Sequence, residues 1–153
     1  YYFKGAEVSD KVAQGDPYTF LHIKGFGKLG QIGAPALPMR NDRFVLSKND
    51  QPSVEIIDAE YMDYPNYMIH PALEPARDTQ GAPDPKFEKD PAVYQKNAFY
   101  PSQNIEISMN QVMREVRIAS VRITPVQFNP MTKQLRVYSK LLKLGPSSAW
   151  FKV

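Results

Sequence analysis

Residues 116–138, VRIASVRITPVQFNPMTKQLRVY, decide the fold because they hold two runs rich in β-branched and aromatic residues on either side of a turn. Residues 126–129 and 134–138 alternate apolar and polar side chains, which is typical of strands with one face on a core and the other in water. Residues 129–133 form the turn, since Asn129 can hydrogen-bond its own backbone and Pro130 fixes φ. The stretch therefore predicts an antiparallel hairpin.

The first run changes phase along its length. Val121 and Ile123 are out of step with the apolar residues at positions 116 and 118. A β-bulge near Ala119 or Ser120 would return all of them to one buried face. We therefore expect a bulge at that point of the strand.

Other parts of the chain have the same strand-like character and little sign of helix. Strands are predicted at residues 18–24, 43–47, 53–64, 104–109 and 140–144, with an interior position for the first and a bulge near Ile56-Ile57 in the third. The sequence predicts an all-β fold, an antiparallel sandwich or a partly open barrel with one long Pro-rich loop. We expect residues 1–153 to form a single domain with a tail at residues 145–153.

Residues 25–30, GFGKLG, spell the G-x-G-x-x-G pattern of a dinucleotide-binding turn. That site needs a helix opening on the motif, so that the phosphate meets the helix N-terminus. The next residues, QIGAPALP at 31–38, contain two prolines and a glycine and are incompatible with such a helix. We expect a glycine-rich turn followed by an extended segment over residues 33–38, and no cofactor.

The composition argues against an enzyme. With no cysteine, the chain has no thiol nucleophile, disulfide or thiolate metal site. His22 and His70 belong to no catalytic or metal-binding motif, and we interpret them as a half-buried strand residue and a loop residue. The carboxylates of residues 53–64 could imitate a glycosidase pair, but the solvated face of an edge strand explains them better. No metal site is expected.

Charge is distributed unevenly. Residues 1–102 hold 11 basic and 14 acidic side chains, and residues 103–153 hold 8 and 2. Aromatic residues are not interleaved with a basic cluster, as a stacking platform for nucleic acid requires, so nucleic-acid binding is not expected. A solvated strand face, or steering toward an acidic protein surface, explains the basic part better. No apolar run approaches the ~18 residues that span a bilayer, so membrane insertion is not expected.

The strand pattern is interrupted over residues 70–102, where six prolines lie among scattered charges. A connection of about 30 residues is far longer than usual, and such connections are commonly functional or disordered. Its first part, HPALEPARDTQGAP at residues 70–83, predicts an exposed and extended loop. We expect Tyr94, Phe99 and Tyr100 to dock the far end of this loop.

Three features in this order resemble the prodomains of gingipain-type cysteine proteases (the C25 family), which are secreted caspase-like proteases of the Bacteroidetes. They are the terminal hairpin with MREVRIASVRI at its start, the G-x-P-x-x-P segment at residues 33–38, and the pair Tyr100-Pro101 before a strand. The resemblance runs from about Gly33 to Leu144. The region before Tyr18 does not match clearly.

The resemblance implies a propeptide that keeps a protease zymogen latent and acts as a chaperone for its folding. In that family a loop enters the cleft of the caspase-like catalytic domain and a basic residue fills the specificity pocket. Carried over, the loop is residues 70–83 and the basic residue is Arg77, with Pro75, Ala76 and Asp78 around it. The resemblance also implies that the tail 145–153 leads to a following catalytic domain or is a linker. The protein would be periplasmic, then secreted or held at the outer-membrane surface.

The residues themselves favour Arg77 for this role. It is the only Lys or Arg between Lys48 and Lys86, and a guanidinium is suited to bidentate capture by a carboxylate at the base of a pocket. An ordinary solvated arginine is the alternative at this position. For the whole chain, the alternative is a non-inhibitory β-sandwich module for adhesion or assembly of a secreted or surface protein, and a hydrolase ranks last.

Overall fold

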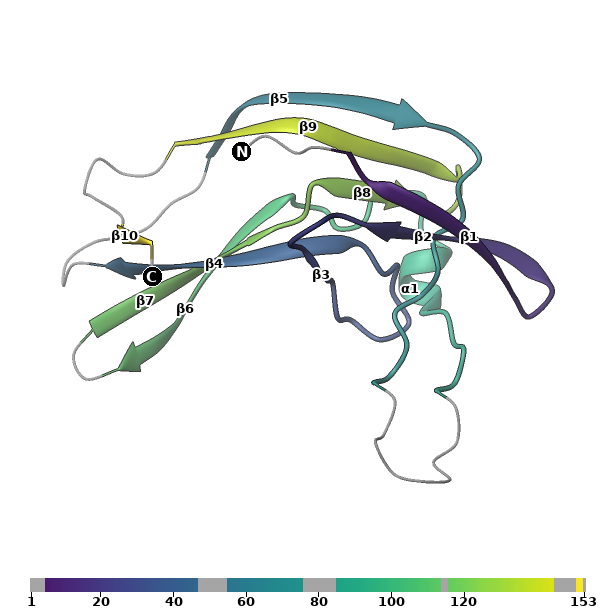
Figure 1. The fold of residues 1–153 in the computed structure, drawn as a ribbon, viewed down its shortest axis with the longest axis horizontal. Coiled ribbons are helices and arrows are strands. Elements are labelled where there is room, and N and C mark those ends of the chain that lie inside the picture. Colours follow the sequence, from purple (N-terminus) through teal and green to yellow (C-terminus); the bar gives the residue numbers. More distant parts are fainter. Residues whose placement is uncertain (1–4, 47–54, 76–84, 114–115, 145–150, 153) are drawn as a thin grey trace.

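The computed structural model describes residues 5–46, 55–75, 85–113, 116–144 and 151–152, and this part of the chain is almost entirely β-structure (Figure 1). Where the chain is described, its helices are too short to reach across a bilayer. The elements are β1 (Glu7–Ala13), β2 (Asp16–His22), β3 (Gly27–Lys28), β4 (Pro38–Leu46), β5 (Glu55–Tyr64), α1 (Pro91–Tyr94), β6 (Ile105–Met113), β7 (Val116–Ile123), β8 (Val126–Asn129), β9 (Gln134–Leu144) and β10 (Phe151–Lys152).

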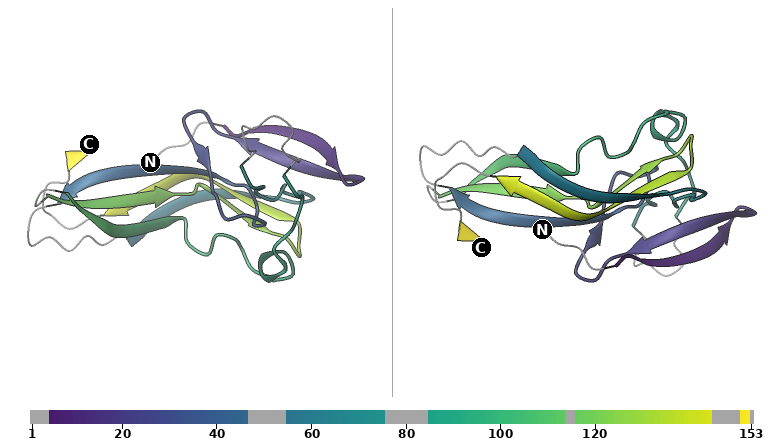
Figure 2. Two further views of the ribbon diagram at one scale, coloured as in Figure 1. Left: turned by 90° about the horizontal axis from the view of Figure 1, so that it is seen from below. Right: turned by 90° about the horizontal axis from the view of Figure 1, so that it is seen from above.

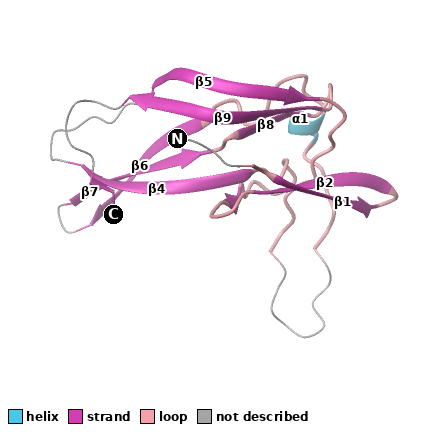
Figure 3. Cartoon of the chain, turned by 45° about the horizontal axis from the view of Figure 1, so that its top comes forward, coloured by secondary structure: helices cyan, strands magenta, loops and turns pink. Residues whose placement is uncertain are grey.

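The strands form three antiparallel sheets (Figure 3). One has the order β10-β4-β7-β6, with β3 also paired to β4; the second has the order β5-β9-β8; and the third is the β1-β2 hairpin. The first two sheets lie one above the other as two layers, and the hairpin lies to one side of them (Figures 1 and 2). None of the three closes on itself among the described strands. The all-β prediction is therefore confirmed, in its sandwich-like form.

The terminal hairpin is confirmed but is shorter than predicted. It consists of β8 and β9, paired from Val126 opposite Val137 to Asn129 opposite Gln134. The run before it forms β7, which pairs with β4 and β6 in the other layer. The chain changes sheet at Pro125, a residue that has no N–H to give to a ladder. The stretch that we expected to be one hairpin therefore joins the two layers.

The bulge predicted near Ala119 or Ser120 is absent from β7, whose register with β4 is continuous. Ala119, Val121 and Ile123 are fully buried and lie on one face without any correction of phase. The irregularity lies in the neighbouring strand β6, between Ser108 and Gln111. That prediction was wrong because Ile118, which is only half-buried, does not share the buried face of Ala119.

The bulge predicted in β5 is confirmed. The register between β5 and β9 shifts between Ile56 and Asp58, so that Ile57 is the extra residue. A second shift lies between Glu60 and Tyr61.

All four residues of β8 are buried, although their alternation predicted a wet face for Gln127 and Asn129. The Gln127 side chain donates to the Pro101 carbonyl at 2.7 Å and accepts from the Tyr138 hydroxyl at 2.8 Å. Asn129 donates to the Asn97 side chain at 2.9 Å. These hydrogen bonds compensate for the water that the two amides lose on burial.

β2 was predicted to be an interior strand, but in the described structure it belongs to the two-stranded sheet with β1. In addition to this pairing, a parallel β-bridge joins Thr19 of β2 to Ile69. Leu21 on one face enters the main hydrophobic core, and Tyr18 on the other face enters a group of aromatic rings. Cover on both faces explains why both carry apolar residues.

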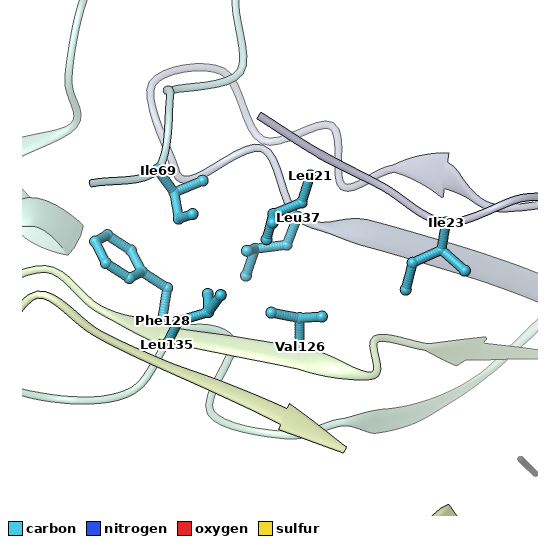
Figure 4. Close-up of a cluster of buried hydrophobic side chains, with 7 residues drawn as sticks. All are labelled: Leu21, Ile23, Leu37, Ile69, Val126, Phe128 and Leu135. Carbon is cyan, nitrogen blue, oxygen red and sulfur yellow. The ribbon is translucent and has the colours of Figure 1, made fainter. Parts of the chain in front are cut away.

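Two hydrophobic clusters hold these parts together. One lies between the two layers and contains Ile105, Val121, Ile123 and Tyr138. The other packs the terminal hairpin of β8 and β9 against β2, against the segment before β4 and against the residue before the long connection (Figure 4). It contains Leu21, Ile23, Leu37, Ile69, Val126, Phe128 and Leu135. Because Ile69 is fully buried, the start of the long connection is anchored in the core.

Candidate functional site

Of the four residues predicted to enter a protease cleft, Pro75 is exposed at the end of the described N-terminal flank of the loop. Ala76, Arg77 and Asp78 lie outside the described residues. The two described flanks, residues 70–75 and 85–90, extend from the same end of the protein (Figure 1). The site can therefore be built from the flanks and from the segment that holds them, which together we name the loop base.

The centre of the loop base is the G-x-P-x-x-P segment at residues 33–38. The Gly33 N–H donates to the Ala72 carbonyl at 2.8 Å, and the Ala72 N–H donates to the Ala34 carbonyl at 2.7 Å. On the other side, the Asp90 N–H donates to the Gly33 carbonyl at 2.9 Å. Gly33 thus binds both flanks and holds Ala72 and Asp90 close together, at a point that we name the loop neck.

Gly33 is a glycine for two reasons. Its φ is +81°, in the left-handed region that side chains disfavour. A Cβ at this position would also lie 3.0 Å from the backbone nitrogen of Asp90 and 3.3 Å from its Cβ. The close approach of the C-terminal flank therefore depends on the missing side chain.

The C-terminal flank ends in the short helix α1. The Asp90 side chain caps it by accepting from the Ala92 N–H at 2.9 Å, and Pro91 occupies the first helical position. The Tyr94 hydroxyl donates to the Ile69 carbonyl at 2.8 Å, and burial raises the pKa of this tyrosine. The bond ties α1 to the N-terminal flank.

The predicted docking of Tyr94, Phe99 and Tyr100 is confirmed. After α1, Tyr100 exchanges two backbone hydrogen bonds with Phe128 of β8, at 2.9 and 2.8 Å. The ring centroid of Phe99 lies 4.4 Å from the Arg136 guanidinium carbon. Both ends of the long connection are therefore attached to the main core.

Four aromatic rings join the flanks a second time. The ring centroid of His70, on the N-terminal flank, lies 5.2 Å from that of Phe87 on the C-terminal flank. It lies 5.8 and 4.3 Å from the ring centroids of Tyr18 and Phe20 of β2. His70 lies in a loop, as interpreted, but its side chain is buried, so the prediction that residues 70–83 are exposed was wrong at this residue. His22, expected to be half-buried, is exposed.

In the described part of the chain, the contacts around the loop base hold the two flanks together. No group of three His, Cys, Asp or Glu side chains that could hold a metal ion is found among the described residues.

The glycine-rich stretch at residues 25–30 forms a turn, as predicted. Gly25 has φ +82°, and residues 27 and 28 then form β3, which pairs with β4. The phosphate-binding helix of a dinucleotide site is therefore replaced by a strand.

Sequence reasoning missed three residues of the loop base: Phe87, Asp90 and the role of Gly33. Asp90-Pro91 carries a signal, since Asp before Pro is a typical N-cap and first helical residue. The sequence around Phe87 and Gly33 contains no such signal, because their roles depend on residues far away in the sequence.

Comparisons with known proteins agree with this architecture. The family model Propeptide_C25 matches residues 2–144. Gingipain R1 of Porphyromonas gingivalis is 30% identical over 117 residues, which cover 74% of this chain and 11% of that protein. The chain thus spans a small part of the length of this relative.

Two solved structures share the fold. A complex of the pro- and mature domains of RgpB from Porphyromonas gingivalis gives a TM-score of 0.81 with 19% identity, covering 97% of this chain and 78% of that chain. A structure addressing the zymogenic latency of gingipain K from Porphyromonas gingivalis gives 0.73 with 23% identity, covering 92% and 80%. The family match over almost the whole chain, together with this fold, shows that the chain belongs to the C25 propeptide family, the propeptides of gingipain-type cysteine proteases.

Proposed function

We propose that this chain keeps a gingipain-type cysteine protease latent by placing residues 75–78 in its active-site cleft, with Arg77 in the specificity pocket. The partner is a caspase-like catalytic domain, whose folding the prodomain also assists. Residues 1–153 act as one domain of that protein, and their tail 145–153 leads toward the partner. The protein passes through the periplasm and is then secreted or held at the outer-membrane surface.

The closed neck of the loop is the observation that supports this proposal most directly. Backbone hydrogen bonds from Gly33 reach Ala72 on one flank and Asp90 on the other, at 2.8 and 2.9 Å. A segment whose ends are fixed has already lost part of its conformational freedom. Association then has less ordering entropy to overcome, and this entropy is a main cost of binding by flexible segments.

The expected weight of Arg77 follows from its chemistry. A buried arginine at the centre of an interface typically costs about 2 kcal/mol or more when it is truncated to alanine. At 1.4 kcal/mol for each factor of ten, this is roughly a 30-fold change in the dissociation constant. A solvated arginine would contribute little, so the two interpretations of Arg77 differ by a measurable amount.

The test is inhibition of the cognate catalytic domain by wild-type prodomain, by Arg77→Ala, and by Lys86→Ala as a control at another basic residue of the same connection. We expect Arg77→Ala to weaken inhibition at least tenfold without lowering the Tm, because the loop base is untouched, and Lys86→Ala to leave inhibition unchanged. The Arg77→Ala variant should still raise the yield of refolded catalytic domain.

An unchanged inhibition constant for Arg77→Ala would remove Arg77 from the mechanism. A wild-type prodomain that binds without inhibiting would favour the alternative of an assembly module.

A further inference from the structure

His70 lies where the core, the N-terminal flank and the C-terminal flank of the loop meet. Its ring is inclined by 31° to that of Phe20, and the ring of Phe87 contacts it edge-on. Its Nδ1 lies 2.6 Å from the Pro71 carbonyl oxygen. Since a carbonyl can only accept, Nδ1 carries the proton and donates it. Neutral His70 therefore fits the site with its hydrogen bond satisfied.

The charged groups around His70 are mainly cations. The ammonium groups of Lys11 from β1 and Lys28 from β3 lie 5.5 and 5.7 Å from the centroid of Phe20, the ring beside His70. The ammonium of Lys89, on the C-terminal flank, lies 5.0 Å from the centroid of Tyr18, the other β2 ring in contact with His70. A second proton on His70 would thus add a positive charge close to those of Lys11 and Lys28.

The nearby titratable groups of the other packed elements do not reverse this balance. The carboxylate of Asp10 on β1 already accepts a hydrogen bond from the Thr19 hydroxyl at 2.8 Å. Tyr94 of α1 lies under Lys89 and donates its hydroxyl to Ile69. An imidazolium can gain about 0.5–1 kcal/mol from an aromatic face, but two ammonium groups already lie over Phe20.

Burial, opposed by the hydrogen bond to Pro71 and reinforced by Lys28 and Lys11, lowers the pKa of His70 below its usual value of 6.5. A group with a depressed basic pKa resists protonation in the closed state, whereas an opened state takes up the proton near pH 6.5. The contribution of His70 to the closed loop base is therefore complete above pH 6.5. It is lost as the pH falls from there toward the pKa of the closed state.

We propose that His70 is an acid-sensitive latch of the loop base, and that its protonation at mildly acidic pH separates the two flanks while the sandwich stays folded. The flanks are the part of the fold that responds, because His70 and Phe87 lie on opposite sides of the loop neck. The separation of the flanks follows from the contact of the His70 ring with Phe87 across the loop neck. Its effect on a protease rests on the proposed function.

The test follows His70 in an NMR titration from pH 8 to pH 5. Amide hydrogen exchange is followed in parallel at Ala72 and Asp90, whose N–H groups close the loop neck, and at Phe128, whose N–H donates to Tyr100. We expect His70 to titrate below pH 6.5, the usual pKa of histidine. Corrected for intrinsic exchange, opening at Ala72 and Asp90 should rise at least tenfold relative to Phe128 between pH 7.5 and pH 5.5.

Two variants complete the experiment. His70→Gln should abolish the pH dependence of exchange at the loop neck, and the matched control His22→Gln should keep it. Titration of His70 at or above pH 6.5 would overturn the proposal, and so would unchanged relative exchange in the wild type. If exchange responds as expected but the prodomain inhibits at no pH, the proposed function fails and the latch stands.

Discussion

Replacing Gly33 by alanine tests whether the loop base depends on close approach of its two flanks. The substitution adds one methyl group to the residue that binds both Ala72 and Asp90. That methyl would lie 3.0 Å from the backbone nitrogen of Asp90. A backbone atom cannot rotate away as a flexible side chain can, so the flank itself must move.

The magnitude has two parts. A residue with a Cβ pays about 1–2 kcal/mol in the left-handed region that Gly33 occupies. Displacing Asp90 also weakens the bonds that Gly33 makes to the two flanks, each worth about 1 kcal/mol net. Together we expect Gly33→Ala to lower the free energy of unfolding by about 3 kcal/mol, which corresponds to roughly 10 °C in Tm for a protein of this size.

The control is Gly25→Ala. Gly25 has φ +82°, almost the same as Gly33, but a Cβ there would meet nothing within 4 Å. It should therefore show the backbone cost alone, about 1–2 kcal/mol. Urea unfolding of both variants gives the difference, and limited proteolysis shows whether Gly33→Ala also exposes the loop flanks. Equal destabilisation of the two variants would refute the reasoning that the flanks meet at Gly33.

Two further substitutions test other contacts. Tyr94→Phe removes the hydroxyl that donates to the Ile69 carbonyl. It should lower the free energy of unfolding in urea by about 1–2 kcal/mol, because a partly buried carbonyl loses its hydrogen-bond partner. An unchanged midpoint would mean that water replaces the hydroxyl without loss. Gln127→Leu leaves the Pro101 carbonyl and the Tyr138 hydroxyl without their partner in β8. It should lower the free energy of unfolding by about 2–4 kcal/mol, although leucine is the more hydrophobic side chain. A stabilised variant would show that β8 needs no buried amide.

Much of the fold follows from patterns within a few residues of each other. The Asn129-Pro130 turn, the register shift at Ile57 and the strand pairs on either side depend on local alternation and turn chemistry. The turn at residues 25–30 could be separated from a nucleotide site because the prolines that follow it forbid a helix. In each case the deciding residues are neighbours in the sequence.

The errors arose where a distant partner decides the outcome. Gln127 is buried because the Pro101 carbonyl and the Tyr138 hydroxyl are placed to bond it, and polarity alone predicted a wet face. His70 was assigned to an exposed loop because prolines follow it, but rings from β2 and from the far side of the loop enclose it. Local sequence predicts which elements form, but does not tell which surfaces they cover.

The loop base also determines how latency would end under the proposed mechanism. If Arg77 fills the pocket of an arginine-specific protease, a cut beside it leaves two new chain ends. One is held at Ala72 and the other at Asp90, both through Gly33. Closing a loop of about 17 residues costs roughly 2.5 kcal/mol of chain entropy, and the contacts of the base offset this cost while the loop is intact. The contacts at Gly33 and His70 do not need an intact loop, so both flanks can stay on the prodomain after the cut. Under the proposed mechanism, we therefore expect a cut prodomain to leave its protease faster when these contacts are weakened, as in Gly33→Ala, than when they are intact.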